Sequence, residues 1–263
     1  MNLNLITNQV SNLAKAVGLF IREESNKIHN DLIEVKGDHN YVTYVDKTAE
    51  QRLIEELKKI LPQSGFIAEE SPELNAGDEF TWIIDPLDGT TNFIHNIPVY
   101  SISIALMYKD ELISGVIYEI NRDECFYAWK DGGAYLNGKK IRVSTSTELN
   151  DSLLGTGFPY YDYSHLDKYL QLFKYFMENT RGVRRMGSAA VDLAYLACGR
   201  FDGFYEYGLN PWDVAAGLII IKEAGGKYCD FKGGDNQLYG KELIASNSLI
   251  HEELLNCVKN YFV

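Results

Sequence analysis

The sequence contains few cysteines, an excess of acidic over basic residues, and no long apolar run. The four cysteines form no Cys-x-x-Cys pair, which is typical of separate reduced thiols rather than of a disulfide framework or a zinc site. No segment approaches the roughly 18 apolar residues of a membrane span, and no basic region followed by an apolar stretch opens the chain. We therefore expect a cytoplasmic protein that has no membrane partner.

Positive charge is scarce along the whole chain. Lysine and arginine number 25 against 37 aspartates and glutamates, so the formal net charge is -12. Nucleic acid is bound through clustered lysine and arginine, and we therefore expect no nucleic-acid partner. The same negative charge would repel a phosphate ester, so a substrate of that kind would require a divalent cation between itself and the protein.

Apolar residues make up 46% of the 263 positions, which is enough for a buried core in one large domain or two smaller ones. Residues 1–145 begin with two amphipathic helical patterns, at 6–21 and 47–61. Short β-rich runs follow, separated in places by turn residues such as Asn137-Gly138, so we predict an α+β half with a largely antiparallel sheet. The predicted strands cover residues 65–68, 80–84, 101–107, 112–118, 125–129 and 141–143.

Residues 146–263 alternate between strand and helix patterns, which is typical of an α/β half. No long linker separates the two halves, so we expect them to pack closely and to form a site at their junction. The predicted strands cover residues 153–156, 183–186, 204–207 and 243–245, and the predicted helices cover 166–177, 189–198, 214–224 and 252–261.

A dense acidic motif, Asp-Pro-Leu-Asp-Gly-Thr-Thr, begins at Asp85. An apolar strand ends at Asp85, which predicts that this carboxylate lies at the carboxyl edge of a sheet, where ligands usually bind. The proline that follows ends the strand in a turn and directs the Leu87 carbonyl toward the same ligand. Asp88 then caps a new helix, where the small Gly89 admits a phosphate beside free backbone N–H groups. Oxygen ligands of this kind suit Mg²⁺.

An isolated Asp-Pro-x-Asp-Gly fragment is equally compatible with a plain capped turn, because both of its dipeptides are common in turns. Further carboxylates favour a metal site. Glu69 and Glu70 end the preceding strand, and Asp213 stands just before a later helix. A plain turn requires none of these residues.

Three motifs resemble those of one known family. Residues 82–93 (WIIDPLDGTTNF) resemble the metal-binding signature of the inositol monophosphatase family. Residues 212–217 (WDVAAG), followed by 223–226 (EAGG), resemble its second signature, and residues 68–71 (AEES) resemble its glutamate motif. Their order and spacing agree across nearly the full chain.

The resemblance implies a layered α+β and α/β sandwich (αβαβα) of the inositol monophosphatase and fructose-1,6-bisphosphatase type, paired as a homodimer. It also implies a lithium-sensitive phosphatase that holds two or three Mg²⁺ ions, for which Mn²⁺ can substitute. Such ions activate a water molecule directly, so the reaction needs no covalent phosphoenzyme. The implied metal ligands are Glu69, which also counts as catalytic, Asp85, the Leu87 carbonyl, Asp88 and Asp213.

The resemblance further assigns Thr90 and Asp46 to orienting the attacking water. From the residues alone, Asp46 is equally well explained as the N-cap of the helix at 47–61, and its two oxygens can serve both roles. Lys36 corresponds to a residue in the family's loop beside the site. Asn40 stands where many members have aspartate and the loop is one residue shorter, so the role of Lys36 stays open.

The resemblance also implies a set of substrate contacts. Backbone N–H groups would hold the phosphate oxygens, and Glu206 would accept a hydrogen bond from a substrate hydroxyl. From the residues alone, Ser188 is also explained as a helix cap and Glu206 as a surface charge. The full set is Asp88, Gly89, Thr90, Gly187, Ser188, Ala189, Glu206 and Asp213.

The function implied is Mg²⁺-dependent hydrolysis of small phosphomonoesters, with myo-inositol monophosphate as the leading substrate. Two alternatives use the same site on phosphorylated riboses or sugars, namely removal of the 2′-phosphate of NADP and hydrolysis of fructose 1,6-bisphosphate. A third alternative belongs to another class. It is a regulatory protein that keeps the fold and acts by binding a partner.

Overall fold

The computed structural model describes residues 1–25, 27, 33–37, 40–72, 74–159 and 162–262. A seven-stranded sheet forms the N-terminal part, in the order β3-β4-β5-β6-β7-β8-β9. All neighbouring strands in it are antiparallel except β3 and β4. Its strands are β3 (Gly65–Ala68), β4 (Phe80–Asp88), β5 (Ser101–Tyr108), β6 (Glu111–Glu119), β7 (Glu124–Trp129), β8 (Gly133–Leu136) and β9 (Lys139–Ile141).

A five-stranded sheet forms the C-terminal part, in the order β11-β10-β12-β14-β13. Strand β10 runs parallel to both of its neighbours, whereas β14 runs antiparallel to β12 and β13, so the sheet is mixed. A separate hairpin joins β1 (Ile33–Gly37) to β2 (Asn40–Thr43). The strands of the second sheet are β10 (Leu153–Thr156), β11 (Gly182–Arg184), β12 (Gly203–Tyr207), β13 (Lys227–Cys229) and β14 (Glu242–Ser246).

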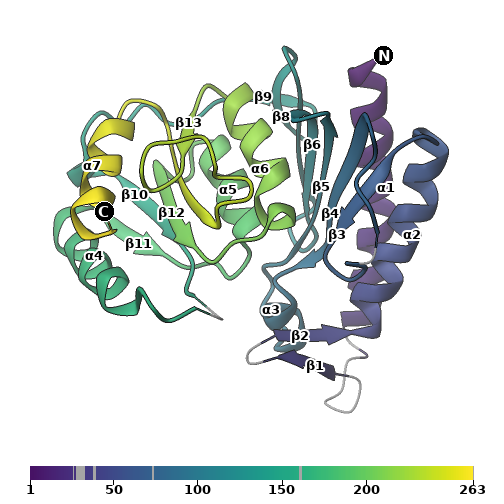
Figure 1. Cartoon of the computed structure of the whole chain (residues 1–263), viewed down its shortest axis with the longest axis horizontal. Helices are drawn as coiled ribbons and strands as arrows, with labels where there is room; N and C mark the ends of the chain where they lie inside the picture. The colour runs from purple at the N-terminus through teal and green to yellow at the C-terminus, as the bar shows by residue number, and fades with distance from the viewer. Residues whose placement is uncertain (26, 28–32, 38–39, 73, 160–161, 263) are drawn as a thin grey trace.

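The helices and the two sheets stack as five layers (Figure 1). Helices α1 (Leu3–Ser25) and α2 (Tyr44–Ile60) cover the outer face of the seven-stranded sheet. Helices α5 (Ala189–Ala197) and α6 (Pro211–Glu223) lie between the sheets. The outer face of the second sheet carries α4 (Leu166–Asn179) and α7 (His251–Phe262), while the short α3 (Thr90–Ile94) follows β4. This αβαβα order confirms the predicted fold class.

Buried apolar side chains fill the space between these layers. One cluster joins α1 and α2 to the first sheet, and another joins α4 and α7 to the second. The central cluster takes Ile117 and Phe126 from the first sheet, Leu193 from α5, Ile220 from α6 and Phe204 from the second sheet. The two halves therefore share the central cluster, and the division at residue 145 stays a prediction. Among the described residues, no helix is long and apolar enough to cross a bilayer.

Several predicted boundaries were wrong for identifiable reasons. Helix α2 begins at Tyr44 rather than at residue 47, because Thr43 caps it through the backbone N–H of Val45. Strand β4 does not end at the proline after Asp85 but continues to Asp88 through a bulge, where a residue without an N–H is tolerated. The short edge strand β13 was missed, because three residues carry too little alternation to predict a strand.

Candidate active site

The bulge in β4 positions the central carboxylate of the acidic motif. The pairing of β4 with β5 shifts register between Asp85 and Asp88. Asp85 is only 2% exposed, and its Oδ1 accepts a hydrogen bond from the backbone N–H of Leu87 at 2.9 Å. The proline inside the bulge needs no ladder partner, because it has no N–H. The motif is therefore a bulged strand end rather than a simple turn after a strand.

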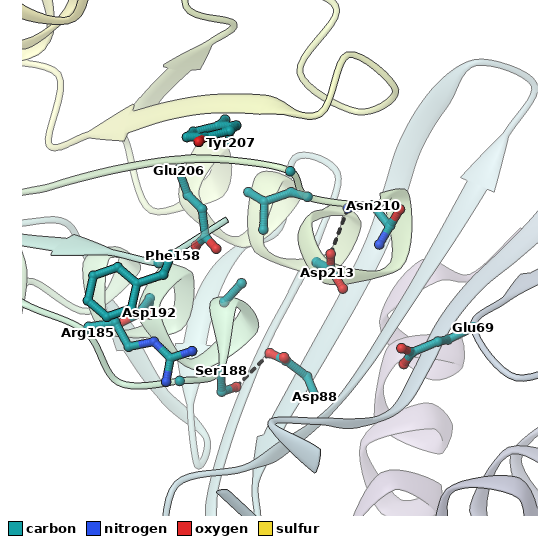
Figure 2. A pocket seen from close by; sticks show the side chains of 15 residues that line it. Glu69, Asp88, Phe158, Arg185, Ser188, Asp192, Glu206, Tyr207, Asn210 and Asp213 are labelled. Carbon is teal, nitrogen blue, oxygen red and sulfur yellow. Dashed lines mark hydrogen bonds between the residues drawn. The ribbon is translucent and has the colours of Figure 1, made fainter. Parts of the chain in front are cut away.

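Asp88 connects the first sheet to the helix layer between the sheets. Its Oδ2 accepts a hydrogen bond from the Ser188 hydroxyl at 2.6 Å, which Figure 2 marks, and another from the Ala190 N–H at 2.7 Å. The prediction that Asp88 caps the helix beginning at Thr90 was wrong. Gly89 is the N-cap of α3, with φ of 96°, and Asp88 instead binds the N-terminus of α5.

Gly89 has to be a glycine at this point in the chain. Its positive φ is costly for residues with a side chain. A Cβ atom on it would also lie 3.1 Å from the Val99 carbonyl oxygen and 3.2 Å from that of Gly187. The chain therefore turns at the end of β4 with Gly89 packed against two other backbone segments, which only glycine allows.

Helix α2 carries Asp46, which the structure connects to Thr90. The interpretation of Asp46 as the N-cap was wrong, because Thr43 is the N-cap. Asp46 occupies the third helical position and completes a capping box with Thr43. Its Oδ2 accepts from the Thr43 N–H at 2.8 Å and from the Thr43 hydroxyl at 2.6 Å. Its other oxygen, Oδ1, lies 3.0 Å from the Thr90 hydroxyl. One carboxylate thus serves both the cap and Thr90.

The Thr90 hydroxyl lies between two acceptors. It is 3.0 Å from Asp46 Oδ1 and 3.0 Å from the Leu87 carbonyl oxygen. A hydroxyl has one hydrogen, so Thr90 donates to one of these oxygens at a time. Its lone pairs remain available to a third group, such as a water molecule.

Asp213 and Glu69 approach the site from the two halves of the molecule (Figure 2). Asp213 is the third residue of α6, whose first residue is proline, and its Oδ2 accepts from the Asn210 N–H at 2.7 Å. Glu69 follows β3, and its backbone N–H donates to the Ile84 carbonyl oxygen of β4 at 3.3 Å. Hydrogen bonds therefore hold the chain at both residues that carry these carboxylates.

A cavity of about 130 Å³ lies at the junction of the halves and gathers most of the predicted site. Figure 2 shows Glu69, Asp88 and Asp213 around it, with Glu206 on the opposite side from Asp88. The predicted residues that line the cavity are Glu69, Asp88, Gly187, Ser188, Ala189, Glu206 and Asp213. Asp85, Leu87, Gly89, Thr90 and Asp46 are not among its lining residues but adjoin it through the contacts described above. The Lys36 and Asn40 side chains lie outside the described part of the chain.

Sequence reasoning missed several residues that line the same cavity. Asp192 is buried in α5, and no described residue hydrogen-bonds to its Oδ1. An aspartate inside the apolar helix sequence AAVDLAYLA was the signal that was available for it. Gly157 gave no such signal, although a Cβ there would lie 1.9 Å from the Glu206 carboxylate. The missed residues are Gly157, Phe158, Arg185, Asp192, Tyr207, Gly208, Leu209 and Asn210.

The cavity concentrates carboxyl groups away from water. Burial raises the pKa of Asp85 well above its usual value, and the charges of Glu69, Asp88 and Asp213 raise it further. Burial and Asp88 raise the pKa of Asp213 to about 7, while burial, Asp213 and Asp88 raise that of Glu206. Buried charges of one sign require a cation or a proton.

The donor types fit a hard divalent cation, because carboxylate and carbonyl oxygens are what Mg²⁺ binds. In the described part of the chain, no three acidic, histidine or cysteine side chains already meet closely enough to hold a metal ion. The residue chemistry nevertheless fits a magnesium site.

Comparison with known proteins gives one consistent match. A model of the inositol monophosphatase family matches residues 2–261. An inositol-1-monophosphatase of Mesorhizobium japonicum is 40% identical over 255 residues, which cover 97% of this chain and 96% of that protein. The Nus factor SuhB of Escherichia coli K12 is 43% identical over 221 residues, which cover 84% of this chain and 83% of that protein.

A solved structure matches the fold in the same way. The crystal structure of extragenic suppressor protein suhB from Bartonella henselae has a TM-score of 0.92 and is 38% identical. The match covers 97% of this chain and 98% of that one. Relatives of similar identity thus carry two kinds of name, that of an inositol phosphatase and that of a Nus factor or suppressor.

Proposed function

Because the chain belongs to the inositol monophosphatase family, we propose that it is a Mg²⁺-dependent phosphatase of small phosphomonoesters, with myo-inositol monophosphate as the leading substrate. The observation that carries this proposal is the group of carboxylates around the buried Asp85, at the edge of a small polar cavity. The chain is strongly acidic, so a bound cation is what would make the cavity attractive to a phosphate ester. The proposed enzyme is a cytoplasmic homodimer.

The metal would be held by oxygen ligands from both halves of the molecule. When bound, two or three Mg²⁺ ions, or Mn²⁺ in their place, neutralise the carboxylates and lower the pKa of a water molecule so that it becomes a nucleophile. The charges of Glu69, Asp88 and Asp213 all act on the Asp85 carboxylate, so a cation held there would offset the repulsion among the four groups. The proposed ligands are Glu69, Asp85, the Leu87 carbonyl, Asp88 and Asp213.

Thr90 and Asp46 would orient the attacking water. The Thr90 hydroxyl can accept a hydrogen bond from a water molecule while it donates to Asp46 Oδ1, 3.0 Å away. Asp46 is 1% exposed, and burial raises its pKa to about 6, which still leaves it mostly ionised at neutral pH. The backbone N–H groups of Gly89 and Thr90 would hold the phosphate oxygens.

The leaving group would occupy the far side of the 130 Å³ cavity, beside Glu206. A buried carboxylate there favours a substrate that presents hydroxyl groups, because a hydroxyl satisfies it with a hydrogen bond. The Ser188 hydroxyl already donates to Asp88, and Gly187, Ser188 and Ala189 would contact the substrate as part of the cavity lining.

Gly157→Ala tests the role of Glu206 without altering its charge. The added methyl group would lie 1.9 to 2.3 Å from the carboxylate atoms and would displace them. We expect kcat/KM for inositol monophosphate to fall roughly 10- to 100-fold, the scale of one hydrogen bond to a charged group. Turnover of an aryl phosphate that lacks hydroxyl groups should fall much less. An equal loss on both substrates would remove Glu206 as a specificity residue.

Phosphate release measured with several cations tests the proposed function directly. We expect turnover of inositol monophosphate with Mg²⁺ or Mn²⁺, and little with Ca²⁺, whose longer bonds and looser geometry suit an in-line reaction poorly. Lithium should inhibit by occupying a magnesium position. Full activity in a chelator would contradict the proposal, and insensitivity to lithium would contradict its inositol-phosphatase part.

Two alternative functions also have support. A neighbouring cavity of about 470 Å³ shares Glu69, Tyr207, Gly208 and Asn210 with the first and also includes His165 and Lys241. That space suits a larger leaving group, as in NADP or fructose 1,6-bisphosphate, and the same phosphate-release assay with those esters tests it. The relative named Nus factor SuhB supports a partner-binding role beside catalysis. An active enzyme whose deletion phenotype is rescued by an inactive Asp85 variant would establish that role.

A further inference from the structure

Helix α2 carries a second buried carboxylate that faces the site. Glu50 lies four residues after Asp46 and therefore on the same face of the helix. It is 1% exposed, and its Oε2 accepts a hydrogen bond from the backbone N–H of Glu70 at 2.8 Å. Burying a carboxylate is costly unless its partners compensate for the lost water. The contact therefore connects α2 to the chain segment that carries Glu69.

The two peptide groups on either side of Glu69 are both held. The peptide before it is fixed by the bond from the Glu69 N–H to the Ile84 carbonyl oxygen of β4. The peptide after it contains the Glu70 N–H, which donates a hydrogen bond to the Glu50 carboxylate. Because a peptide group is planar, holding the N–H of one residue also orients the carbonyl of the residue before it. Both backbone dihedral angles of Glu69 are therefore restrained, and with them the direction in which its Cα–Cβ bond leaves the backbone.

We propose that Glu50 is a positioning residue that directs the Glu69 carboxylate into the cavity, where Figure 2 shows it. This rests on the proposed function, because it takes Glu69 as a magnesium ligand. Helix α2 then supports two parts of the site at once. Asp46 holds Thr90 from the first turn, and Glu50 holds the backbone that bears Glu69 from the next turn.

Calorimetric titration of Mg²⁺ into the metal-free full chain tests this role. Glu50→Ala removes the acceptor, so we expect Mg²⁺ affinity to fall roughly 10- to 100-fold, the usual effect of losing a residue that orients a ligand. Glu50→Leu fills the same buried space without an acceptor and should show the same loss. Glu50→Gln keeps a carbonyl oxygen for the Glu70 N–H and should stay within about threefold of the parent.

Glu55→Ala is the matched control, because Glu55 is an exposed glutamate of the same helix. It should leave Mg²⁺ affinity unchanged. A purely structural role for Glu50 would lower the melting temperature of the metal-free protein but leave Mg²⁺ affinity intact in Glu50→Ala and Glu50→Leu, and that result would overturn the proposal. Loss of affinity in Glu50→Gln equal to that in Glu50→Ala would also overturn it, because charge rather than the hydrogen bond would then be responsible. A parent protein that binds no Mg²⁺ would instead contradict the proposed function itself.

Discussion

Replacing Asp85 with asparagine is expected to abolish Mg²⁺-dependent turnover while the protein stays folded. Asp85 is almost fully buried, and the charges of Glu69, Asp88 and Asp213 all raise its pKa beyond the effect of burial. Asparagine has the same shape but lacks the charge that a shared cation needs. We expect kcat to fall on the order of 10³-fold or more, since losing a charged metal ligand should exceed the loss of one hydrogen-bond donor.

The stability of the metal-free protein distinguishes this loss from unfolding. The pKa of Asp85 is raised in the folded protein, so its ionised form opposes folding above the pKa of the unfolded chain, and asparagine removes that penalty. Metal-free Asp85→Asn should therefore melt no lower than the parent. Asp78→Asn, at an exposed position before β4, is the control and should keep parental turnover. Turnover of Asp85→Asn within tenfold of the parent at saturating Mg²⁺ would refute the ligand role.

Removing either member of the Thr90 and Asp46 pair is expected to lower kcat by roughly 10²- to 10⁴-fold, the usual scale for positioned proton-transfer groups. The two side chains are 3.0 Å apart and connect α3 to α2. In Thr90→Ala the water loses the hydroxyl that orients it, and in Asp46→Asn the hydroxyl loses its charged acceptor. The double variant should lose little more than either single one, because residues that act as a unit are not additive.

If Asp46 only capped helix α2, the expected results would differ. Asparagine still offers an oxygen to the Thr43 N–H, so a residue that only caps α2 should tolerate Asp46→Asn in both melting temperature and kcat. Thr90→Ser keeps the hydroxyl and serves as the matched control, with kcat near that of the parent. Mg²⁺ affinity should change little in all of these variants. A parental kcat in Asp46→Asn would leave Asp46 as a capping residue alone.

Local sequence predicted the main elements where the pattern was long or the residues were specific. The apolar strand before Asp85, the Asn137-Gly138 turn and the helix predicted at 214–224 depend on neighbours within a few residues. That helix begins earlier than predicted, at Pro211, so Asp213 lies in its first turn rather than before it. The family motifs are equally local, and the family and the fold class they implied are confirmed by the comparisons. The assigned roles of the site residues stay predictions.

What local sequence predicted poorly depends on partners that are distant along the chain. Asp88 has the spacing of a helix cap, but its carboxylate binds Ser188, a hundred residues away, because the two halves bring β4 against the start of α5. Gly157 carries no local signal, since its small size matters only beside Glu206. In the sequence, Glu50 is one more polar position of an amphipathic helix. Only the structure shows that the Glu70 N–H, just after β3, donates a hydrogen bond to it.

The sequence by itself determined which chemical groups this protein has and which short segments hold them, because caps, turns and periodic patterns act over a few residues. It therefore determined the acidic motif, the all-oxygen donor types and the alternation of strands and helices in the C-terminal half. Only the tertiary structure decided which carboxylate faces which, how far each is buried and which backbone groups hold it. Those properties arise from packing the two halves around one core, and no local pattern records a contact between segments a hundred residues apart.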